Sequence, residues 1–337
     1  MSRTPRRAFH TSLPMNAGEE LLQKLAELRV DRSRGQRKPH KPLLMLCAIQ
    51  RLLATRQSEV PYAALEDQLR PLLDLYAPPV KGEHHPELPY WHLQSDDVWE
   101  IPHASEMQRS VGGFPRMGAL RASAGRIPRR FAQALLADPA LAERVVQLLL
   151  DQHFEPSLHE DLRSAIDLGQ GRTSQGNDAE RVAEPPPEGA GSSKNQRSGE
   201  RARDSSFRDQ VLAAYDYRCA VTGFQALLGG SAFCLEAAHV YWHSQGGPST
   251  VDNGLALTPT LHKLLDHGAW SIDDERRVIV SRHFSGSDNA LHELRSLHGR
   301  PLRAPAPGFP PLSLDSIRWH RESRRGGIFR PPAVGIA

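Results

Sequence analysis

Cysteine is scarce in this sequence: Cys47, Cys219 and Cys234 are the only three among 337 residues. They are too few and too scattered for a disulfide framework, and none belongs to the C-x-x-C pair of a structural zinc site. The sequence therefore predicts a cytoplasmic protein in a reducing compartment, without structural zinc. We expect Cys219 to be a small core residue.

Long apolar runs and an excess of one charge are also missing. No segment approaches the roughly 18 consecutive apolar residues of a membrane helix, so we expect no membrane partner. Lys and Arg number 42 against 39 Asp and Glu, a net charge of +3. Any surface that binds nucleic acid must therefore be local.

One segment lacks nearly all core-forming side chains. Residues 169–206 contain no aromatic residue and only five apolar ones, all Ala or Val. Such a segment cannot bury enough surface to offset its ordering entropy, which predicts a flexible linker. The length leaves room for two domains, and we place them at 18–168 and 207–337. Residues 1–17 are Arg-rich and free of acids, which favours a disordered leader, or a true start at Met15, over a transit peptide.

The hydrophobic pattern of the first domain is mainly helical. We expect helices over 18–30, 43–56, 62–76, 129–137 and 140–154, the second of them opened by Pro42. Residues 90–93 and 98–101 resemble two strands joined by a turn over 94–97. The fold class is therefore α+β, with a mainly helical, winged-helix-like N-terminal domain.

In the second domain His239, Asn253 and His262 follow one another at intervals of 14 and 9 residues. Residues 236–240 and 254–257 read as strands, and a helix should begin at Pro259, with Thr258 as its cap, and end at Gly268. Hydrolysis of a phosphodiester needs a general base for water and an electrophile for the developing charge.

His239 could supply the base, and Asn253 could hold its loop. His262 and Asp266 share a helical face at i and i+4 and could both reach a divalent cation. His243 and His267 lack such support, and we expect both to face solvent.

This segment resembles the HNH endonucleases through Glu236-Ala-Ala-His239, Gly246-Gly247 and Asp252-Asn-Gly-Leu-Ala-Leu257. The resemblance implies a small ββα-metal domain in which His239 is the general base, Asn253 orders the loop and His262 binds the metal, Mg²⁺ or Mn²⁺. Many members carry an Asp or His ligand where this chain has Ala238. The metal would then be held by His262, Asp266 and Glu236, or the site would be degenerate and inactive.

A basic C-terminal tail follows the HNH-like segment. Arg318 and Arg321 lie beside Trp319 and His320, and we expect this cluster to contact DNA.

The first domain is similar to the sulfur-binding domains of type IV restriction enzymes that attack phosphorothioate-modified DNA. The similarity lies in the motifs Lys38-Pro-His-Lys-Pro-Leu-Leu-Met-Leu46, Pro86-Glu-Leu-Pro-Tyr-Trp-His-Leu93, Val98-Trp-Glu-Ile101 and Gly112-Gly-Phe114. By this resemblance His40 and Lys41 lie near the phosphate, Leu88, Pro89 and His92 surround the sulfur, and Gly112 and Gly113 allow close backbone approach. Leu88 departs from the ring that relatives commonly carry there. Arg109 and Arg116 are candidate DNA contacts by charge alone.

Together these resemblances imply a modification-dependent restriction endonuclease that binds double-stranded, phosphorothioated DNA and cleaves it by a one-metal HNH mechanism. Two alternatives remain: the same architecture reading methylcytosine, and a DNA-binding protein whose HNH site does not cleave. A single site cuts one strand, so a duplex break implies a homodimer or two independent nicks. The flexible linker predicts cuts at variable distances from the mark.

Overall fold

The computed structural model describes residues 16–31, 37–78, 82–110, 112–168, 206–228, 230–322 and 327–330. Residues 1–15 of the predicted leader and 169–205 of the predicted linker lie outside these ranges. The α+β class is confirmed: helices dominate, and the strands form small two-stranded sheets. None of the described helices is both long and apolar enough to cross a membrane.

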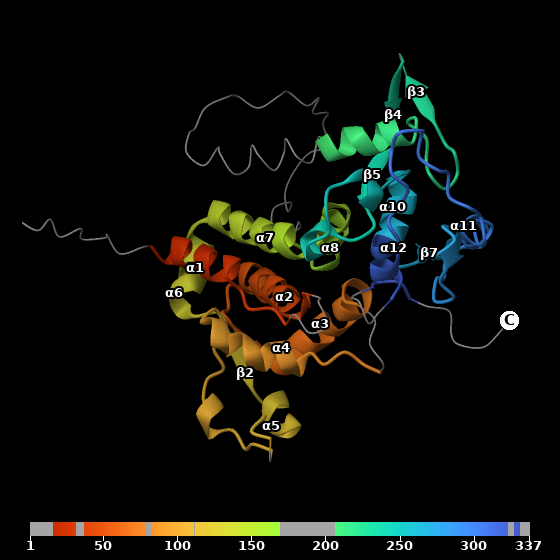
Figure 1. Cartoon of the computed structure of the whole chain (residues 1–337). Helices are drawn as coiled ribbons and strands as arrows, with labels where there is room; N and C mark the ends of the chain where they lie inside the picture. Colours follow the sequence, from red (N-terminus) through yellow and green to blue (C-terminus); the bar gives the residue numbers. More distant parts are fainter. Residues whose placement is uncertain are drawn as a thin grey trace, which may run out of the picture.

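Six helices build most of the N-terminal domain, which occupies the lower left of Figure 1. They are α1 (Ala17–Ala26), α2 (His40–Thr55), α3 (Tyr62–Tyr76), α6 (Arg129–Ala137), α7 (Pro139–His153) and α8 (His159–Ala165). Helix α2 is central, because every residue from Leu43 to Ile49 is buried. It begins at His40 rather than at Pro42, which is its third residue, and α1 ends four residues before the predicted Val30.

The predicted hairpin over 90–101 is wrong. Residues Glu87–His92 form helix α4, and Leu93–Asp96 continue it as the 3-10 turn η2. Tyr90 and Leu93 are both fully buried, and a helix brings side chains three residues apart to one face, whereas a strand would point them to opposite faces.

The small sheet of this domain instead pairs β1 (Glu59–Pro61) with β2 (Ala124–Arg126). Gly125 is required there, since a Cβ would lie 2.2 Å from the Trp99 ring. The short elements η3 (Ala104–Glu106) and α5 (Met117–Arg121) lie in the loop that leads to β2.

The described part of the C-terminal domain begins with a helix over 206–214 and contains three hairpins. They are β3 (Ala226–Leu228) with β4 (Ser231–Phe233), β5 (Glu236–His239) with β6 (Gly254–Leu257), and β7 (Trp270–Ile272) with β8 (Val278–Val280). Helix α10 (Pro259–Asp266) follows β6, and α11 (Asp288–Arg295) and α12 (Leu314–Arg321) complete the domain. Cys219 is buried in this core, as the sequence predicts.

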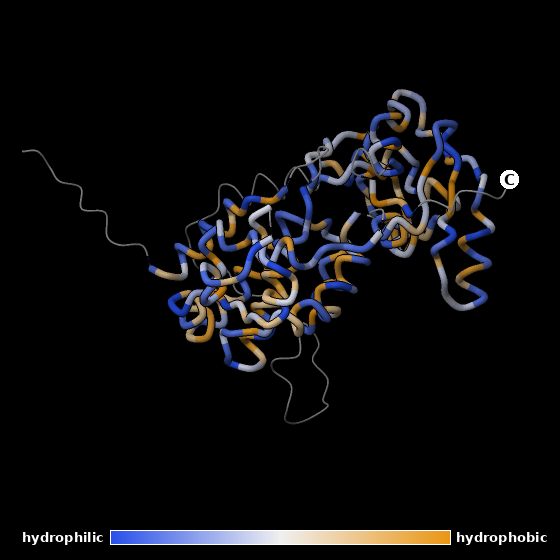
Figure 2. Tube along the Cα trace, turned by 90° about the horizontal axis from the view of Figure 1, so that it is seen from below, coloured by the Kyte–Doolittle hydropathy of each residue, from blue (hydrophilic) through white to orange (hydrophobic). Residues whose placement is uncertain are grey.

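The two domains appear as two lobes in Figure 2, with apolar residues concentrated inside each. They are packed against each other rather than merely tethered. Trp242, Trp319 and Ile328 of the C-terminal half belong to the same buried apolar cluster as the N-terminal helices. The contacts between the domains are made by residues outside the predicted linker, for example Glu155 and Ser244.

The side chains of the basic segment around α12 are ion-paired or buried within the protein. Arg318 and Arg321 both form ion pairs with Asp274, at 2.9 and 2.7 Å. Trp319 is buried and stacks on Tyr241 with ring centroids 4.5 Å apart. His320 is fully buried as well, so these two rings are not part of a DNA-contacting tail. Contact of DNA with Arg318 and Arg321 remains a prediction that would require competition with Asp274.

We expect His320 to make the protein sensitive to acid. Its Nε2 donates to the Leu265 carbonyl at 3.1 Å, and its Nδ1 pairs with the Ser271 hydroxyl at 2.8 Å. Burial lowers the pKa of His320 to about 4, whereas the unfolded chain binds this proton near pH 6.5. The free energy of unfolding should therefore fall by roughly 3 kcal/mol between pH 6.5 and pH 4 from this residue.

Urea unfolding of the wild type and of His320→Gln at several pH values measures this effect. The variant should be less stable at pH 7 and show a shallower loss on acidification, while His103→Gln, an exposed control, should keep the wild-type slope. Equal slopes for all three proteins would contradict the prediction.

Candidate functional site

The hairpin of β5 and β6 and the helix α10 bring the three predicted motif residues into one unit. His239 ends β5 and lies opposite Gly254 at the start of β6. A Cβ on Gly254 would lie 2.3 Å from Val211, so this glycine allows the helix over 206–214 to pack directly on the hairpin. That helix places the ring of Phe207 against His239.

His239 is held by stacking and by one hydrogen bond. Its ring is parallel to that of Phe207, with centroids 4.0 Å apart, and its Nε2 lies 3.1 Å from the Ser249 hydroxyl. Its Nδ1 makes no hydrogen bond to any described residue. Burial, and next the neighbouring His243, lower the pKa of His239 to about 4. The imidazole is therefore neutral at pH 7, the state in which it can accept a proton.

Asn253 is fully buried, and its side-chain amide makes three hydrogen bonds. Its Oδ1 accepts from the Tyr241 N–H at 2.8 Å, and its Nδ2 donates to the carbonyls of Tyr241 and Pro248 at 2.9 and 2.8 Å. These bonds connect the end of the loop to its beginning, directly after His239. These bonds are compatible with the loop-ordering role predicted for Asn253, which stays a prediction.

The imidazole of His262 lies between two carboxylates, those of Glu236 and Asp266. His262 Nδ1 lies 2.8 Å from Glu236 Oε2, and Nε2 lies 3.2 Å from Asp266 Oδ2. Burial opposes protonation of this ring, but the two carboxylates outweigh it and raise the pKa of His262. Glu236 reaches the imidazole because β5 is regular, so Glu236 and Ala238 share a strand face.

Two of these groups fit a divalent cation. The carboxylate of Glu236 and the imidazole of His262 supply hard oxygen and nitrogen donors. Their separation of 2.8 Å is close to the edge, about 3 Å, of an octahedron of ligands about 2.1 Å from Mg²⁺. Among the described residues no group of three or more His, Cys, Asp or Glu side chains is arranged to hold a metal, so the remaining ligands would be water or phosphate.

Asp266 was expected to bind the metal, but the structure gives it other partners. It is only 3% exposed. Its Oδ1 accepts from Trp242 Nε1 at 2.8 Å, and its Oδ2 accepts from the hydroxyl of Ser157. The i,i+4 spacing places Asp266 near His262, yet its carboxylate points toward the N-terminal domain.

Two smaller expectations about this unit are wrong. Thr258 precedes α10 in an extended conformation but makes no capping hydrogen bond through its side chain. His243 is exposed, as expected, whereas His267 packs against Tyr76 of the N-terminal domain with ring centroids 5.5 Å apart.

The predicted phosphate-binding residues His40 and Lys41 lie at the start of α2. Burial, followed by the nearby His84, lowers the pKa of His40 to about 4, so His40 offers a neutral imidazole. Lys41 forms a 2.5 Å ion pair with Asp96, which is itself buried. A DNA phosphate would have to compete with this carboxylate for the ammonium group.

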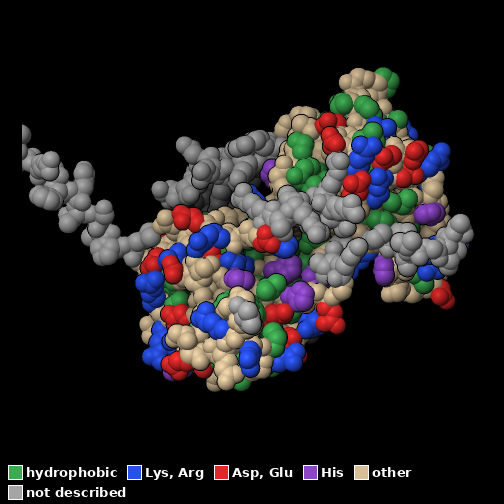
Figure 3. All heavy atoms as spheres, turned by 60° about the horizontal axis from the view of Figure 1, so that its bottom comes forward, with side chains coloured by type: hydrophobic (Ala, Val, Ile, Leu, Met, Phe, Trp, Pro, Cys, Tyr) green, Lys and Arg blue, Asp and Glu red, His purple; other side chains and the backbone are tan. Residues whose placement is uncertain are grey.

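The predicted sulfur-contacting residues lie on α4, which packs against α2. Leu88 is 44% exposed and His92 is exposed, whereas Pro89 is buried beneath them. The ring of Phe114 lies 6.2 Å from that of His92. Figure 3 shows histidines gathered between cationic and apolar side chains on this side of the molecule.

The loop that contains Gly112 and Gly113 lies next to the surface of α4. Gly112 and Gly113 have open space where a Cβ would stand, and Gly113 has a φ of +79°, which favours glycine. Arg109 lies over the Trp91 ring, 5.5 Å from its centroid. Arg116 is exposed at the end of the loop. The structure therefore brings Arg109 toward the α4 surface.

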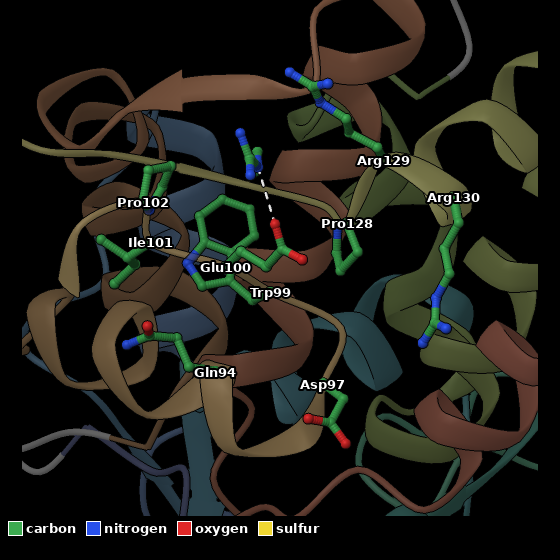
Figure 4. Close-up of a pocket in the computed structure, with 10 residues that line it drawn as sticks. Gln94, Asp97, Trp99, Glu100, Ile101, Pro102, Pro128, Arg129 and Arg130 are labelled. Atoms are coloured by element: carbon green, nitrogen blue, oxygen red, sulfur yellow. Dashed lines mark hydrogen bonds and ion pairs between the residues drawn. The ribbon is translucent and has the colours of Figure 1, made fainter. Parts of the chain in front are cut away.

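Sequence reasoning did not find the groove shown in Figure 4. It has a volume of about 780 Å³ and is lined by residues of the 94–102 segment, β2 and the start of α6. Arg126 on its wall is paired with Glu100, and Arg130 is paired with Glu20. Because Arg126 and Arg130 are already ion-paired, the groove does not offer a strongly basic surface for a DNA backbone.

Two family models match separate parts of the chain. Residues 18–170 match the family model of the ScoMcrA-like DNA sulfur-binding domain, and residues 219–273 match the model of an HNH endonuclease. No curated protein matches the sequence.

Several solved structures show partial likeness. The sulfur-binding domain of ScoMcrA complexed with phosphorothioated DNA has 20% identity and a TM-score of 0.39, over 44% of this chain and 96% of that chain. The type IV phosphorothioation-dependent restriction endonuclease ScoMcrA has 20% identity and a TM-score of 0.36, over 48% of this chain and only 29% of that chain. The modification-dependent restriction endonuclease TagI has 25% identity and a TM-score of 0.26, over 35% and 37% of the two chains.

Proposed function

We propose that this chain, which joins a ScoMcrA-like DNA sulfur-binding domain to an HNH endonuclease domain, is a restriction endonuclease that binds phosphorothioated double-stranded DNA and hydrolyses phosphodiester bonds. One observation carries the nuclease half of the proposal. A neutral imidazole, His239, ends the same strand whose first residue, Glu236, meets His262 of α10.

In this reaction Nδ1 of His239 accepts the proton of a water molecule whose oxygen attacks phosphorus. The new P–O bond forms as the bond to the leaving oxygen breaks, and that oxygen takes a proton from solvent. Phe207 and Ser249 hold the ring in place during the transfer. Glu236 and His262 would hold Mg²⁺ or Mn²⁺, which stabilises the developing negative charge when bound.

The recognition half of the proposal depends on the surface of α4. A non-bridging sulfur is larger and a weaker hydrogen-bond acceptor than oxygen, so apolar groups such as Leu88 and Pro89 would favour it over a hydrated oxygen. His40 and Lys41 would lie near the phosphate, and His92 would lie beside the sulfur. The loop at Gly112 and Gly113 would approach the DNA backbone. Arg109 and Arg116 would add contacts that are independent of sequence.

Plasmid cleavage tests the proposal. The full chain is incubated with phosphorothioated and unmodified plasmid in Mg²⁺ or Mn²⁺, and with EDTA. We expect cleavage of the modified plasmid alone, lost in EDTA. Nicked circles would indicate that one site cuts one strand, whereas linear product would indicate a dimer or paired nicks.

The alternatives give different results. Absence of cleavage under every condition would leave a DNA-binding protein with a degenerate site at Ala238. Preferential competition by a methylcytosine duplex over a phosphorothioated duplex, in binding to the full chain, would remove the sulfur assignment.

A further inference from the structure

The N-terminal domain meets the nuclease unit at the turn between α7 and α8, which contains η4 (Pro156–Leu158). Figure 1 shows this turn and α8 beside the C-terminal domain. Three hydrogen-bonded pairs cross the boundary here: Glu155 Oε1 with the Ser244 N–H at 2.9 Å, the Ser157 hydroxyl with Asp266 Oδ2, and Asp161 with Lys263 Nζ at 2.9 Å. The three C-terminal partners belong to α10 and to η5 (His243–Gln245), the turn that follows β5.

Asp266 is the most deeply buried of these partners, and its hydrogen bonds come from both domains. Trp242, which belongs to the apolar cluster of the N-terminal domain, donates to Oδ1. Ser157 and His262 both approach Oδ2. A carboxylate oxygen can only accept a hydrogen bond, so the Ser157 hydroxyl and the Trp242 N–H are the donors and Asp266 is the acceptor of both.

This arrangement orients the imidazole that faces Glu236. Asp266 accepts from Nε2 of His262, which leaves Nδ1 directed at Glu236. In metal sites a carboxylate bonded to the far nitrogen of a ligating histidine fixes both its tautomer and its ring orientation. Asp266 occupies that position, and Ser157 of the other domain fixes Asp266.

We propose that the DNA-reading domain completes the nuclease site: Ser157 is a positioning residue that holds Asp266 and, through it, the ring of His262. The inference rests on the proposed nuclease function and assigns part of that site to the other domain. It accounts for the direction of the Asp266 carboxylate, which points away from Glu236 and into the domain boundary.

Substitution of Ser157 tests this inference in the full chain. Ser157→Ala removes the hydroxyl, so His262 loses part of its support. We expect kcat for phosphorothioated plasmid to fall about 10-fold, and the Mn²⁺ concentration for half-maximal rate to rise about 10-fold. The KM for DNA should not change. Mn²⁺ binding without DNA, followed by the electron paramagnetic resonance signal of free Mn²⁺, should weaken by the same factor.

Two further variants serve as controls. Ser157→Thr keeps the hydroxyl and should restore both the rate and the Mn²⁺ affinity. Ser164→Ala makes the same change at an exposed position of α8 and should behave as wild type. Wild-type rate and Mn²⁺ affinity in Ser157→Ala would overturn the proposal. So would a loss explained by weaker DNA binding or a lower unfolding midpoint.

The Mn²⁺ measurement separates this inference from the proposed function. If the wild type binds Mn²⁺ but cleaves no DNA, the nuclease proposal fails while the change in Mn²⁺ affinity still tests Ser157. If the wild type cleaves DNA and Ser157→Ala matches it in both measurements, only the positioning role fails. If the wild type does not bind Mn²⁺ at all, the positioning role is overturned.

Discussion

Replacing His239 by Ala is expected to lower the rate of cleavage by about 10²–10⁴-fold, because a positioned general base contributes about that much. The variant keeps the stacking surface of Phe207 and the α4 surface of the reading domain, so binding of phosphorothioated duplex should be unchanged. Single-turnover cleavage of labelled plasmid measures the rate, and a gel-shift titration measures binding.

His243→Ala is the matched control for this prediction. The His243 ring lies 5.5 Å from that of His239, but its side chain is exposed and belongs to the turn η5. Its loss should change the rate little. A His239→Ala variant that cleaves at the wild-type rate, or an equal loss in His243→Ala, would remove His239 from the role of base.

The pKa of His239 also predicts how the cleavage rate depends on pH. Because burial lowers the pKa of His239 to about 4, the neutral base should predominate down to about pH 5. The acid limb of kcat/KM, which reports the free enzyme, should then fall near pH 4. An ordinary histidine with a pKa near 6.5 would already lose about 10-fold by pH 5.5. Circular dichroism at each pH separates this loss from acid unfolding.

The nuclease unit could be predicted closely from sequence because its contacts are local. The residues from Glu236 to Asp266 form two paired strands and a helix, and the motif fixes their order. Strand β6 has the predicted bounds, and Asn253 makes the bonds that its position in the motif implies. Spacing alone could not show which atom of Asp266 faces which partner.

Features that depend on distant residues were not predictable in the same way. Residues 90–93 are rich in aromatic residues, which is typical of strands. Contacts of Tyr90 with Tyr62 and Trp99 nevertheless favour a helix there. Arg318 and Arg321 read as a free basic patch until Asp274, more than 40 residues earlier, is placed beside them.

The composition of a linker likewise carries no information on whether two domains dock. Hydrogen bonds such as that between the Arg37 N–H and Gln245 restrain the nuclease relative to the reading domain. Cleavage at variable distances from the modified phosphate would require these contacts to break. Mapping the cleavage positions therefore tests whether the two domains stay docked.

Asn253→Ala is expected to cost about 3 kcal/mol or more in the free energy of unfolding, together with most of the cleavage activity. The side chain is fully buried and makes three hydrogen bonds to the backbone. Its removal leaves one N–H and two carbonyls without these partners, and each unsatisfied buried group costs about 1–3 kcal/mol. Because those groups lie in the loop after His239, the base should lose its position even where the domain stays folded.

Urea unfolding and hydrogen exchange of the Tyr241 amide measure the two effects separately. Asn253→Asp keeps the acceptor for Tyr241 but turns a carboxylate oxygen toward two carbonyl oxygens, so it should be at least as destabilising as Asn253→Ala. Asn289→Ala, at an exposed site in α11, should stay within about 0.5 kcal/mol of wild type. If Asn253→Ala unfolds like Asn289→Ala and the Tyr241 amide exchanges no faster, the loop does not depend on Asn253, and another contact must hold His239 in place.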